Sequence, residues 1–349
     1  MASEQDLLVE TVVDILGGHE PFVLTPDRPW DEPLWAALVE TGLTGVGIAE
    51  DAGGSGGELA DAVAIVRTLA AGAAAAPVAE QLLVAGPALT AAGVPVPSWE
   101  APIGVAVAPS VQATADGDRF LLTGTATGVA WVGVAERVAV LTGSGEETVL
   151  ALVGTAGPTT VPAANLAGEP RGTVTFEATA AAGARLTAEQ ADVFRARYAL
   201  ARAVQIAAAL EQVLAWTVQY AGERHQFGRP LAKFQAIQME LAEMAGEVTA
   251  VTALTDAAVQ ALDRSEGVVL AAAAAKVRAG AAVEVVARLA HQVHGAIGFT
   301  QEYRLHHLTR RCWSWRDEAG SELEWSRVLG AGLLAGGGDA LWESLTRAV

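Results

Sequence analysis

Cysteine is nearly absent from this sequence: its 349 residues include only Cys312. A single cysteine excludes a disulfide within the chain, which fits a reducing compartment. No neighbouring residue marks Cys312 as an activated thiolate. We therefore interpret it as an inert thiol packed in the interior.

Long apolar runs are also missing. A bilayer span needs roughly 18 to 20 apolar residues, and the Ala-rich stretch at 268–275 stops at Lys276. The amino terminus, Met-Ala-Ser-Glu-Gln-Asp, lacks the cationic flank and apolar core of a secretory signal. We expect a cytoplasmic protein without a membrane segment.

Positive charge is scarce, because 22 Lys and Arg residues stand against 40 Asp and Glu residues, for a formal net charge of -18. Such a surface repels phosphate backbones and anionic lipid headgroups, which argues against nucleic acid and membranes as partners. Hydrophobic residues make up 52% of the chain, enough to build two or three cores. The composition therefore predicts a globular protein.

Hydrophobic periodicity divides the chain into three parts. Residues 1–100 have helical spacing, interrupted by a Gly-rich loop at 51–57. Prolines then mark a boundary, and residues 101–182 alternate with period two, which predicts a small antiparallel β domain. Residues 183–349 return to long helices, typical of an antiparallel four-helix bundle. The predicted class is α+β, with an N-terminal helical domain, a central β domain and a C-terminal bundle.

The long helices carry three apolar stripes at helical spacing. Their members are Ile206, Leu210, Val213 and Leu214; Phe234, Ile237, Leu241, Met244, Val248 and Val251; and Val286, Leu289 and Val293. We interpret them as core, buried against sister helices within the chain or across a subunit interface.

The first cluster of chemistry-bearing residues joins the first two long helices at 223–238. It reads Glu-Arg-His-Gln-Phe-Gly-Arg-Pro-Leu, then Ala, then Lys-Phe-Gln-Ala-Ile-Gln. Guanidinium and amide groups near a helix amino terminus suit a pyrophosphate. From local chemistry alone, a solvated basic cap is an equally good interpretation.

The second cluster, His-Gln-Val-His-Gly-Ala-Ile-Gly-Phe-Thr at 291–300, ends a long helix with small residues. Small residues permit close approach of a backbone or a flat ligand, although such a cluster is a weak signal by itself. His291 and His294 are three residues apart, without a third metal ligand at a suitable spacing. We expect these histidines to make hydrogen bonds at the helix end.

Together, the two clusters resemble the acyl-CoA dehydrogenase family. The pattern Arg224-x-x-Phe227-Gly228-x-Pro230-Leu231-x-x-Phe234-Gln235-x-x-Gln238 precedes Gln292-x-x-Gly295-x-x-Gly298-Phe299, in the family's order and on long helices. Thr-Gly-Leu-Thr-Gly-Val at 41–46 and Glu-Asp-Ala-Gly-Gly at 50–54 resemble the family as well. The likeness covers nearly the whole chain and is weakest in the β domain.

This resemblance implies an FAD-dependent enzyme that removes the α proton of an acyl-CoA with a glutamate while the β hydrogen leaves as hydride. It also implies an oligomer with each flavin at a subunit interface, and an electron-accepting flavoprotein as a further partner. By this resemblance, the candidate residues for the flavin of a neighbouring subunit are Arg224, Gln226, Phe227, Leu231, Phe234, Gln235, Gln292, Gly295 and Ala296, with Ala296 replacing a usual glycine.

The half-site that a family subunit supplies to its own flavin is poorly matched. The Thr-Glu-Pro phrase that ends in Gly-Ser-Asp is missing from the corresponding residues 105–111. The usual Trp-Ile-Thr strand is replaced, around 124–130, by Gly-Thr-Ala-Thr-Gly-Val-Ala. We therefore expect the β domain of this chain to lack the family's contacts to the isoalloxazine ring.

The catalytic base is displaced too. Counting without gaps from Gln292 puts Ala319 in the place of the family's glutamate, with Glu318 one residue early and Ser321 as a further candidate for cofactor binding. One residue along a helix rotates a side chain by about 100°, an objection that weakens in a loop. The family's other location for the base falls near Tyr198, which carries no carboxylate.

Three hypotheses remain open. The chain is the non-catalytic partner in a heteromeric acyl-CoA dehydrogenase, and completes flavin sites whose base lies on a paralogous subunit. It is a self-sufficient homo-oligomer with Glu318 as the base. Or it is a helical scaffold or regulatory protein that keeps the fold without flavin.

Overall fold

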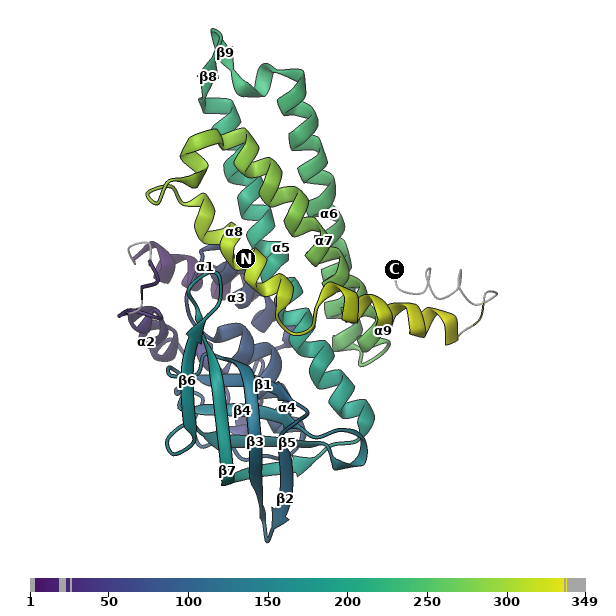
Figure 1. Cartoon of the computed structure of the whole chain (residues 1–349). Coiled ribbons are helices and arrows are strands. Elements are labelled where there is room, and N and C mark those ends of the chain that lie inside the picture. Colours follow the sequence, from purple (N-terminus) through teal and green to yellow (C-terminus); the bar gives the residue numbers. More distant parts are fainter. Residues whose placement is uncertain (1–3, 19–22, 26, 336, 338–349) are drawn as a thin grey trace. The chain divides into compact units, whose positions relative to one another are not determined.

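The computed structural model describes residues 4–18, 23–25, 27–335 and 337. Contacts divide the chain into two compact units, residues 1–66 with 74–201 and residues 67–73 with 202–349. Each unit is described by itself, with the labels of Figure 1.

The first unit begins with helices that start at recognisable signals. The carboxylate of Asp31 accepts a hydrogen bond from the Leu34 N–H at 3.1 Å, which satisfies one of the unpaired donors at the start of α2. The last residues of α3, from Arg67 on, belong to the second unit. The helical elements are α1 (Glu4–Gly17), α2 (Glu32–Glu40), α3 (Leu59–Ala71), a π-helical segment (Glu80–Ala85) and α4 (Gly86–Ala91).

The Gly-rich segment at 51–57 is the tight loop that the sequence predicts. A Cβ on Gly54 would lie 2.2 Å from the carbonyl oxygen of Ile48, so only glycine fits there. The hydroxyl of Ser55 donates to the carbonyl of Gly42 at 2.6 Å and fastens the loop to the end of α2.

A buried glutamine ties these helices to the start of the β domain. The Gln81 amide donates to the carbonyl oxygens of Thr44 and Trp99 at 2.8 and 2.7 Å. Its oxygen accepts from the Ile103 N–H at 3.1 Å, where the first strand begins. All the polar atoms of this side chain are therefore hydrogen-bonded.

The β domain is a seven-stranded sheet in the order β2-β3-β1-β4-β5-β7-β6. Because β3 also pairs with β7, strands β3, β1, β4, β5 and β7 form a closed ring. Val111, Leu122, Val140 and Phe176 belong to its core, each at most 2% exposed. The strands are β1 (Ile103–Ala108), β2 (Gln112–Asp116), β3 (Arg119–Ala130), β4 (Arg137–Thr142), β5 (Val149–Gly154), β6 (Thr159–Ala164) and β7 (Pro170–Arg185).

The antiparallel arrangement predicted for this domain is wrong for one of its described pairings. β1 and β4 are parallel, with Val105 opposite Ala139, whereas the other pairings of the sheet are antiparallel. Parallel neighbours need a crossover, and the excursion through β2 and β3 provides it. Alternating hydrophobicity reports which face of a strand is buried, but not the direction of the neighbouring strand.

The second unit is helical, and α5 enters it from the first unit. Short connections make consecutive helices antiparallel, and Figure 1 shows α5, α6 and α7 as long neighbours. The Thr252 hydroxyl on α6 donates to the Glu211 carboxylate on α5 at 2.6 Å. Beyond the predicted four-helix bundle, α9 packs against α7, where Gly332 faces Leu270. The helices are α5 (Ala188–Glu223), α6 (Gln235–Asp263), α7 (Val268–His294), α8 (Leu305–Asp317) and α9 (Glu322–Ala335).

Most of the predicted stripes form the bundle core. Ile206, Met244 and Val286 are fully buried. In contrast, the first two residues of the second stripe, Phe234 and Ile237, are only half-buried in the single chain. The bundle is therefore well covered in the middle and less so where α6 begins.

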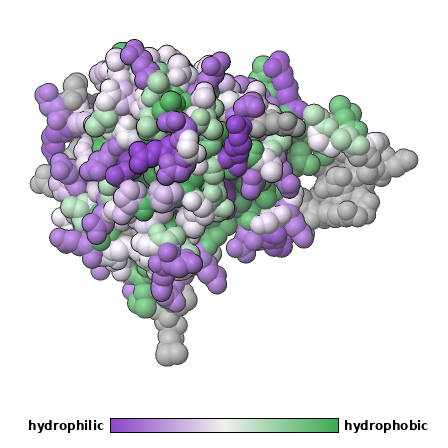
Figure 2. Space-filling view, turned by 90° about the horizontal axis from the view of Figure 1, so that it is seen from below, coloured by the Kyte–Doolittle hydropathy of each residue, from purple (hydrophilic) through white to green (hydrophobic). Residues whose placement is uncertain are grey.

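Within the described residues, no helix combines the length and apolar character that a bilayer crossing requires. Figure 2 shows one face on which hydrophobic residues occur in small groups among hydrophilic ones.

Candidate functional site

The first motif forms a short hairpin between α5 and α6. Strands β8 (His225–Gln226) and β9 (Arg229–Pro230) pair across Phe227 and Gly228, whose φ angles are 51° and 78°. Two central residues at positive φ make a turn whose twist matches a two-residue hairpin. Because Phe227 is not a residue that favours this region, the turn holds it at a cost in backbone energy.

The hairpin presents an aromatic tip and polar side chains to the outside. Phe227 is 92% exposed and makes an edge contact with Phe234, with ring centroids 6.2 Å apart. The guanidinium of Arg229 lies over the Phe234 ring at 4.1 Å. Arg224 and Gln226 are exposed, as is Gln235 in the first turn of α6. The Leu231 N–H donates to the Arg224 carbonyl at 2.8 Å and closes the base of the hairpin.

The second motif forms the end of α7. Gly295 ends the helix with a φ of 64°, and no atom lies within 4 Å of where its Cβ would stand. Gln292 and Ala296 are exposed. Phe299, 74% exposed, stacks on His291 with ring centroids 4.5 Å apart.

The two histidines of this motif make hydrogen bonds at the helix end, as the sequence predicts. His294 Nδ1 lies 2.8 Å from the Ala290 carbonyl oxygen, and His291 Nε2 lies 3.0 Å from the Thr309 hydroxyl. Burial lowers the pKa of both imidazoles below the usual histidine value. Both rings are therefore neutral at physiological pH.

The two motifs lie at the same end of the bundle. The Tyr220 hydroxyl, one turn before Arg224, donates to the His294 carbonyl at 3.3 Å, and the Tyr220 ring stacks on His294 at 4.5 Å. Arg304 lies over Trp216 at 4.2 Å and adds a second link. We call this region, residues 224–235 and 292–299, the hairpin end of the bundle. Sequence reasoning missed the linking aromatics, although Trp216, Tyr220 and Arg224 follow one another at a spacing of four.

Glu318 and Ser321 lie elsewhere. Lys276 contacts the carbonyls just before Glu318 and precedes Gln292 by 16 residues in α7, a separation of about 24 Å at 1.5 Å per residue. Ser321 starts α9, because its N–H and hydroxyl donate to the Glu324 carboxylate at 2.6 and 2.8 Å. These bonds lower the pKa of Glu324. Ser321 therefore serves its own helix as a cap.

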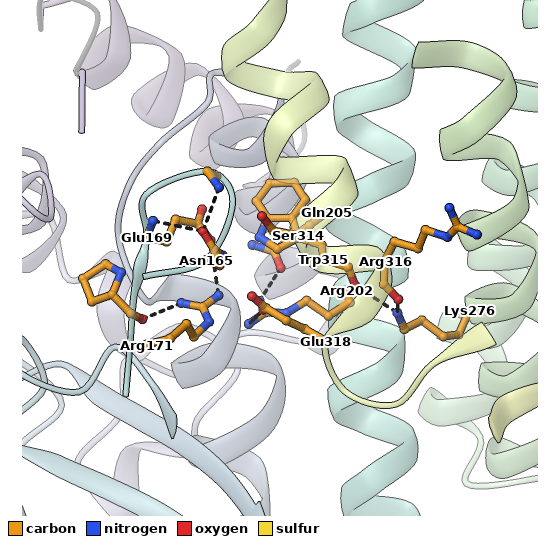
Figure 3. A network of polar contacts seen from close by, with 12 residues as sticks. Asn165, Glu169, Arg171, Arg202, Gln205, Lys276, Ser314, Trp315, Arg316 and Glu318 are labelled. Atoms are coloured by element: carbon orange, nitrogen blue, oxygen red, sulfur yellow. Dashed lines mark hydrogen bonds and ion pairs between the residues drawn. The ribbon is translucent and has the colours of Figure 1, made fainter. Parts of the chain in front are cut away.

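Glu318 lies where the chain leaves α8, in extended conformation. It is in a loop, so the rotational objection raised by the sequence does not apply. Its carboxylate forms an ion pair with the Arg202 guanidinium at 2.8 Å, and Arg202 is only 1% exposed (Figure 3). Sequence reasoning did not single out Arg202, because it lies far away in the chain, on α5.

In the first unit, the residues corresponding to a subunit's own flavin contacts are only partly taken up by packing, since Thr125, Thr127 and Gly128 are exposed. Val129 and Ala130 at the end of β3 are fully buried, and Trp131 follows with a φ of 61° and 3% exposure. The Arg171 guanidinium lies 5.7 Å from the Trp131 ring and pairs with Glu169 at 3.2 Å. Figure 3 shows this pair, with Asn165 beside it.

Family comparisons agree with these motifs. Residues 3–95 match the family described as acyl-CoA dehydrogenase, N-terminal domain, and residues 181–322 match acyl-CoA dehydrogenase, C-terminal domain. The chain belongs to the acyl-CoA dehydrogenase family.

Individual relatives match this acyl-CoA dehydrogenase over most of its length. Acyl-CoA dehydrogenase IpdE2 from Mycobacterium tuberculosis is 29% identical over 320 residues, which cover 88% of this chain and 90% of IpdE2. A chain of the ChsE4-ChsE5 complex from the same species superposes with a TM-score of 0.85 at 24% identity, over 95% of this chain and 98% of that one. The Tcur3481-Tcur3483 steroid ACAD gives 0.84 at 24%, with the same coverage. The resemblance and the α+β fold predicted from the sequence are confirmed.

Acyl-CoA dehydrogenases are flavin-dependent oxidoreductases, and the residues present fit a dinucleotide at one place. At the hairpin end, the exposed side chains of Arg224, Gln226 and Gln292 are donors suited to phosphate and ribose oxygens, and Gly295 leaves open space. The β domain fits less well, because the Ser110 hydroxyl already donates to the Thr125 carbonyl at 3.2 Å.

Proposed function

We propose that this chain is the partner subunit of a heteromeric acyl-CoA dehydrogenase. In this role it completes an FAD site whose base and remaining contacts belong to a paralogous subunit. The overall reaction is α,β-dehydrogenation of an acyl-CoA, with electrons passing on to an electron-accepting flavoprotein.

The observation that carries this proposal is the exposure of the hairpin end. Phe227 at 92% and Phe299 at 74% exposure are large apolar side chains held outward on an ordered scaffold. Exposed aromatics next to donors are typical of surfaces that bind a partner or a ligand. The half-buried start of the second stripe, at Phe234 and Ile237, extends the same surface. We assign this surface to contact with a paralogous subunit and its flavin.

The chain's residues would act by holding and orienting the cofactor. Arg224 would bind the pyrophosphate, Gln226 and Gln292 would hydrogen-bond its polar atoms, and Phe227 would cover an apolar face. When bound, the flavin accepts the hydride that leaves the acyl β carbon. The proton on the α carbon would be taken by a carboxylate of the other subunit.

The packing of the β domain supports a one-sided role. The family's Trp-Ile-Thr strand corresponds here to residues 124–130, which end in the buried Val129 and Ala130 and are followed by Trp131 under Arg171. Side chains committed to packing and to a buried ion pair are poorly suited to receive a flavin ring. The similar ChsE4-ChsE5 complex has two components, which supports a two-component assembly here. The similar steroid ACAD supports a bulky acyl group.

Flavin content and activity distinguish the three hypotheses. The chain is purified alone, and again after co-expression with paralogous acyl-CoA dehydrogenases of the same organism, and FAD is counted per subunit from its absorbance. We expect a colourless chain alone and a yellow, active complex. A yellow and active chain on its own would instead support the self-sufficient enzyme. A chain that stays colourless in every pairing would support the scaffold.

Arg224→Ala tests the assignment of the hairpin end. Loss of a charge-assisted phosphate contact should weaken FAD binding in the complex by at least tenfold, corresponding to roughly 1.5 to 3 kcal/mol. Arg185→Ala is the matched control, since Arg185 is a half-exposed arginine of the β domain paired with Glu147. Equal FAD affinity in the two variants would count against the proposal.

A further inference from the structure

Three charged residues from distant parts of the second unit meet in the bundle interior. Arg202 on α5 and Lys276 on α7 are each 1% exposed, and the Glu318 side chain after α8 is 16% exposed. Figure 3 shows them among the carbonyl groups at the end of α8. Buried charge is costly unless it is paired, so this arrangement requires a specific explanation.

Arg202 holds Glu318 by its side chain. One guanidinium nitrogen of Arg202 lies 2.8 Å from the Glu318 carboxylate, and the other donates to the Gln205 amide oxygen at 2.6 Å. Gln205 lies one turn further along α5, so it orients the guanidinium from its own helix. The Glu318 side chain is therefore directed into the bundle.

Lys276 contacts the backbone of the segment just before Glu318. Its ammonium donates to the carbonyls of Trp315 and Arg316 at 2.9 and 2.5 Å. These belong to the last turn of α8, where carbonyls lack partners within the helix. Burial, and next the charge of Arg202, lower the pKa of Lys276 to about 7. At slightly alkaline pH, the Arg202–Glu318 pair is then electrically balanced beside a neutral amine.

The residues after Glu318 are fixed as well. Ala319 and Gly320 both have positive φ, 57° and 94°. The Trp325 indole N–H donates to the Ala319 carbonyl at 2.8 Å. These features hold the loop 318–321 in a conformation that directs Glu318 inward.

We propose that Arg202 and Lys276 lock Glu318 and its loop in an inward, ion-paired arrangement, which leaves this chain without a base of its own. This inference rests on the proposed partner role and names the residues that enforce it. A general base must take up a proton in contact with the substrate. The Glu318 carboxylate is instead engaged by the buried Arg202 guanidinium at 2.8 Å and faces the bundle rather than a substrate. Glu318 then has a structural role in the bundle, although its position is the nearest to that of the family's base.

A double-mutant cycle on the isolated full-length chain tests the lock. Arg202→Met and Glu318→Gln each leave one buried partner without its counter-charge, so each should lower Tm by about 5 to 10 °C. The double variant should lose clearly less than the sum of the two. Arg202→Lys should recover part of the stability, because it restores a cation. The control pair is Arg288→Met with Glu243→Gln, an exposed and distant pair at 3.9 Å, which should shift Tm by only about 1 °C.

Turnover in the assembled complex provides the second measurement. Butyryl-, octanoyl- and palmitoyl-CoA and a cyclic acyl-CoA are compared as reductants of the flavin, and the best is used for all variants. Glu318→Gln should keep the rate of flavin reduction within about twofold of wild type, since each tenfold change corresponds to 1.4 kcal/mol at the transition state. If the variants do not fold well enough for this assay, Glu318→Asp, which keeps the charge, takes their place.

Two results would overturn the lock. One is a loss of flavin reduction by orders of magnitude in Glu318→Gln with Tm unchanged, which would make Glu318 the base. The other is strict additivity of the Tm shifts, which would show that Arg202 and Glu318 do not act as a pair. The Tm cycle needs neither flavin nor partner, so it remains interpretable if the complex fails to bind FAD.

Discussion

The two ends of the helical bundle treat their functional side chains in opposite ways. At the hairpin end, Arg224, Gln226 and Gln292 are exposed, and Phe227 projects outward at 92% exposure. In the loop after α8, Glu318 is paired with the buried Arg202, and Ser321 caps the next helix. The side chains of one region are exposed, whereas those of the other are engaged within the chain.

Under the proposed function, the fold keeps one half of a shared site and converts the other half into structure. An exposed donor contributes little to the stability of its own chain, so the hairpin end has no evident structural reason to carry Phe227 and Arg224. A buried ion pair, in contrast, is strongly destabilising when one partner is lost. Substitutions at the two regions should therefore separate, with stability responding at one and flavin binding at the other.

The largest expected effect is on stability, at Gly320. A Cβ there would lie 2.6 Å from the Trp325 indole nitrogen, and the φ of 94° disfavours any other residue. Gly320→Ala should lower the free energy of unfolding by about 2 to 4 kcal/mol. Gly330→Ala in α9, where no atom lies within 4 Å, should raise it by about 0.5 to 1 kcal/mol. Urea unfolding of both variants checks this contrast, and similar midpoints would contradict it.

A smaller effect follows from the protonation of Lys276. Its folded-state pKa of about 7 lies below the ordinary 10.5, because of burial and the charges of Arg202 and Arg316, opposed by Glu318 and Asp317. Between these values the unfolded chain binds a proton that the folded chain releases, so the stability of the folded state rises with pH. Below pH 7 the folded state bears the full cost of the buried charge.

Lys276→Met removes this dependence. The Tm difference between wild type and Lys276→Met should shift in favour of wild type from pH 6.5 to pH 9, over roughly the window set by the two pKa values. Differential scanning fluorimetry across this range measures the shift. A Tm difference that stays constant with pH would show that Lys276 does not titrate there.

The smallest effect, in free energy, is expected at the exposed tip of the hairpin. Phe227→Asn removes the ring but keeps a residue that tolerates positive φ. The Tm of the isolated chain should stay within about 1 °C, since exposed substitutions rarely exceed 0.5 kcal/mol. FAD affinity of the complex should fall roughly tenfold.

Leu166→Asn, at a 60% exposed apolar position of the β domain, is the matched control for Phe227→Asn. It should change neither Tm nor FAD affinity. A drop in the Tm of the isolated chain with Phe227→Asn, but unchanged FAD affinity, would reverse the assignment of the two regions.

Local patterns in the sequence were sufficient for the helices and for the loop at 51–57, whereas the hairpin around Gly228 was not predicted. Each depends on residues a few positions apart, where spacing and glycine content already restrict the backbone. The histidine hydrogen bonds of α7 were predicted for the same reason. The burial of Cys312 was predicted as well, and burial raises the pKa of its thiol to about 12.

Long-range contacts were beyond such patterns. The Tyr220–His294 bond joins residues 74 positions apart, and the parallel pairing of β1 with β4 depends on where β2 and β3 lie between them. Arg202, which forms the ion pair with Glu318, lies on α5, so nothing near position 318 indicates it. Periodicity reports that a face is buried, but it does not report what covers it.

The sequence by itself determined the family and the order of helices and strands, and it supplied the prediction of which residues hold a dinucleotide. It also showed that the carboxylate nearest to the family's base is displaced by one residue. Only the tertiary structure decided that the two motifs share one end of the bundle and that Glu318 faces Arg202. The physical reason is that buried charges must find partners wherever the packing of distant helices places them.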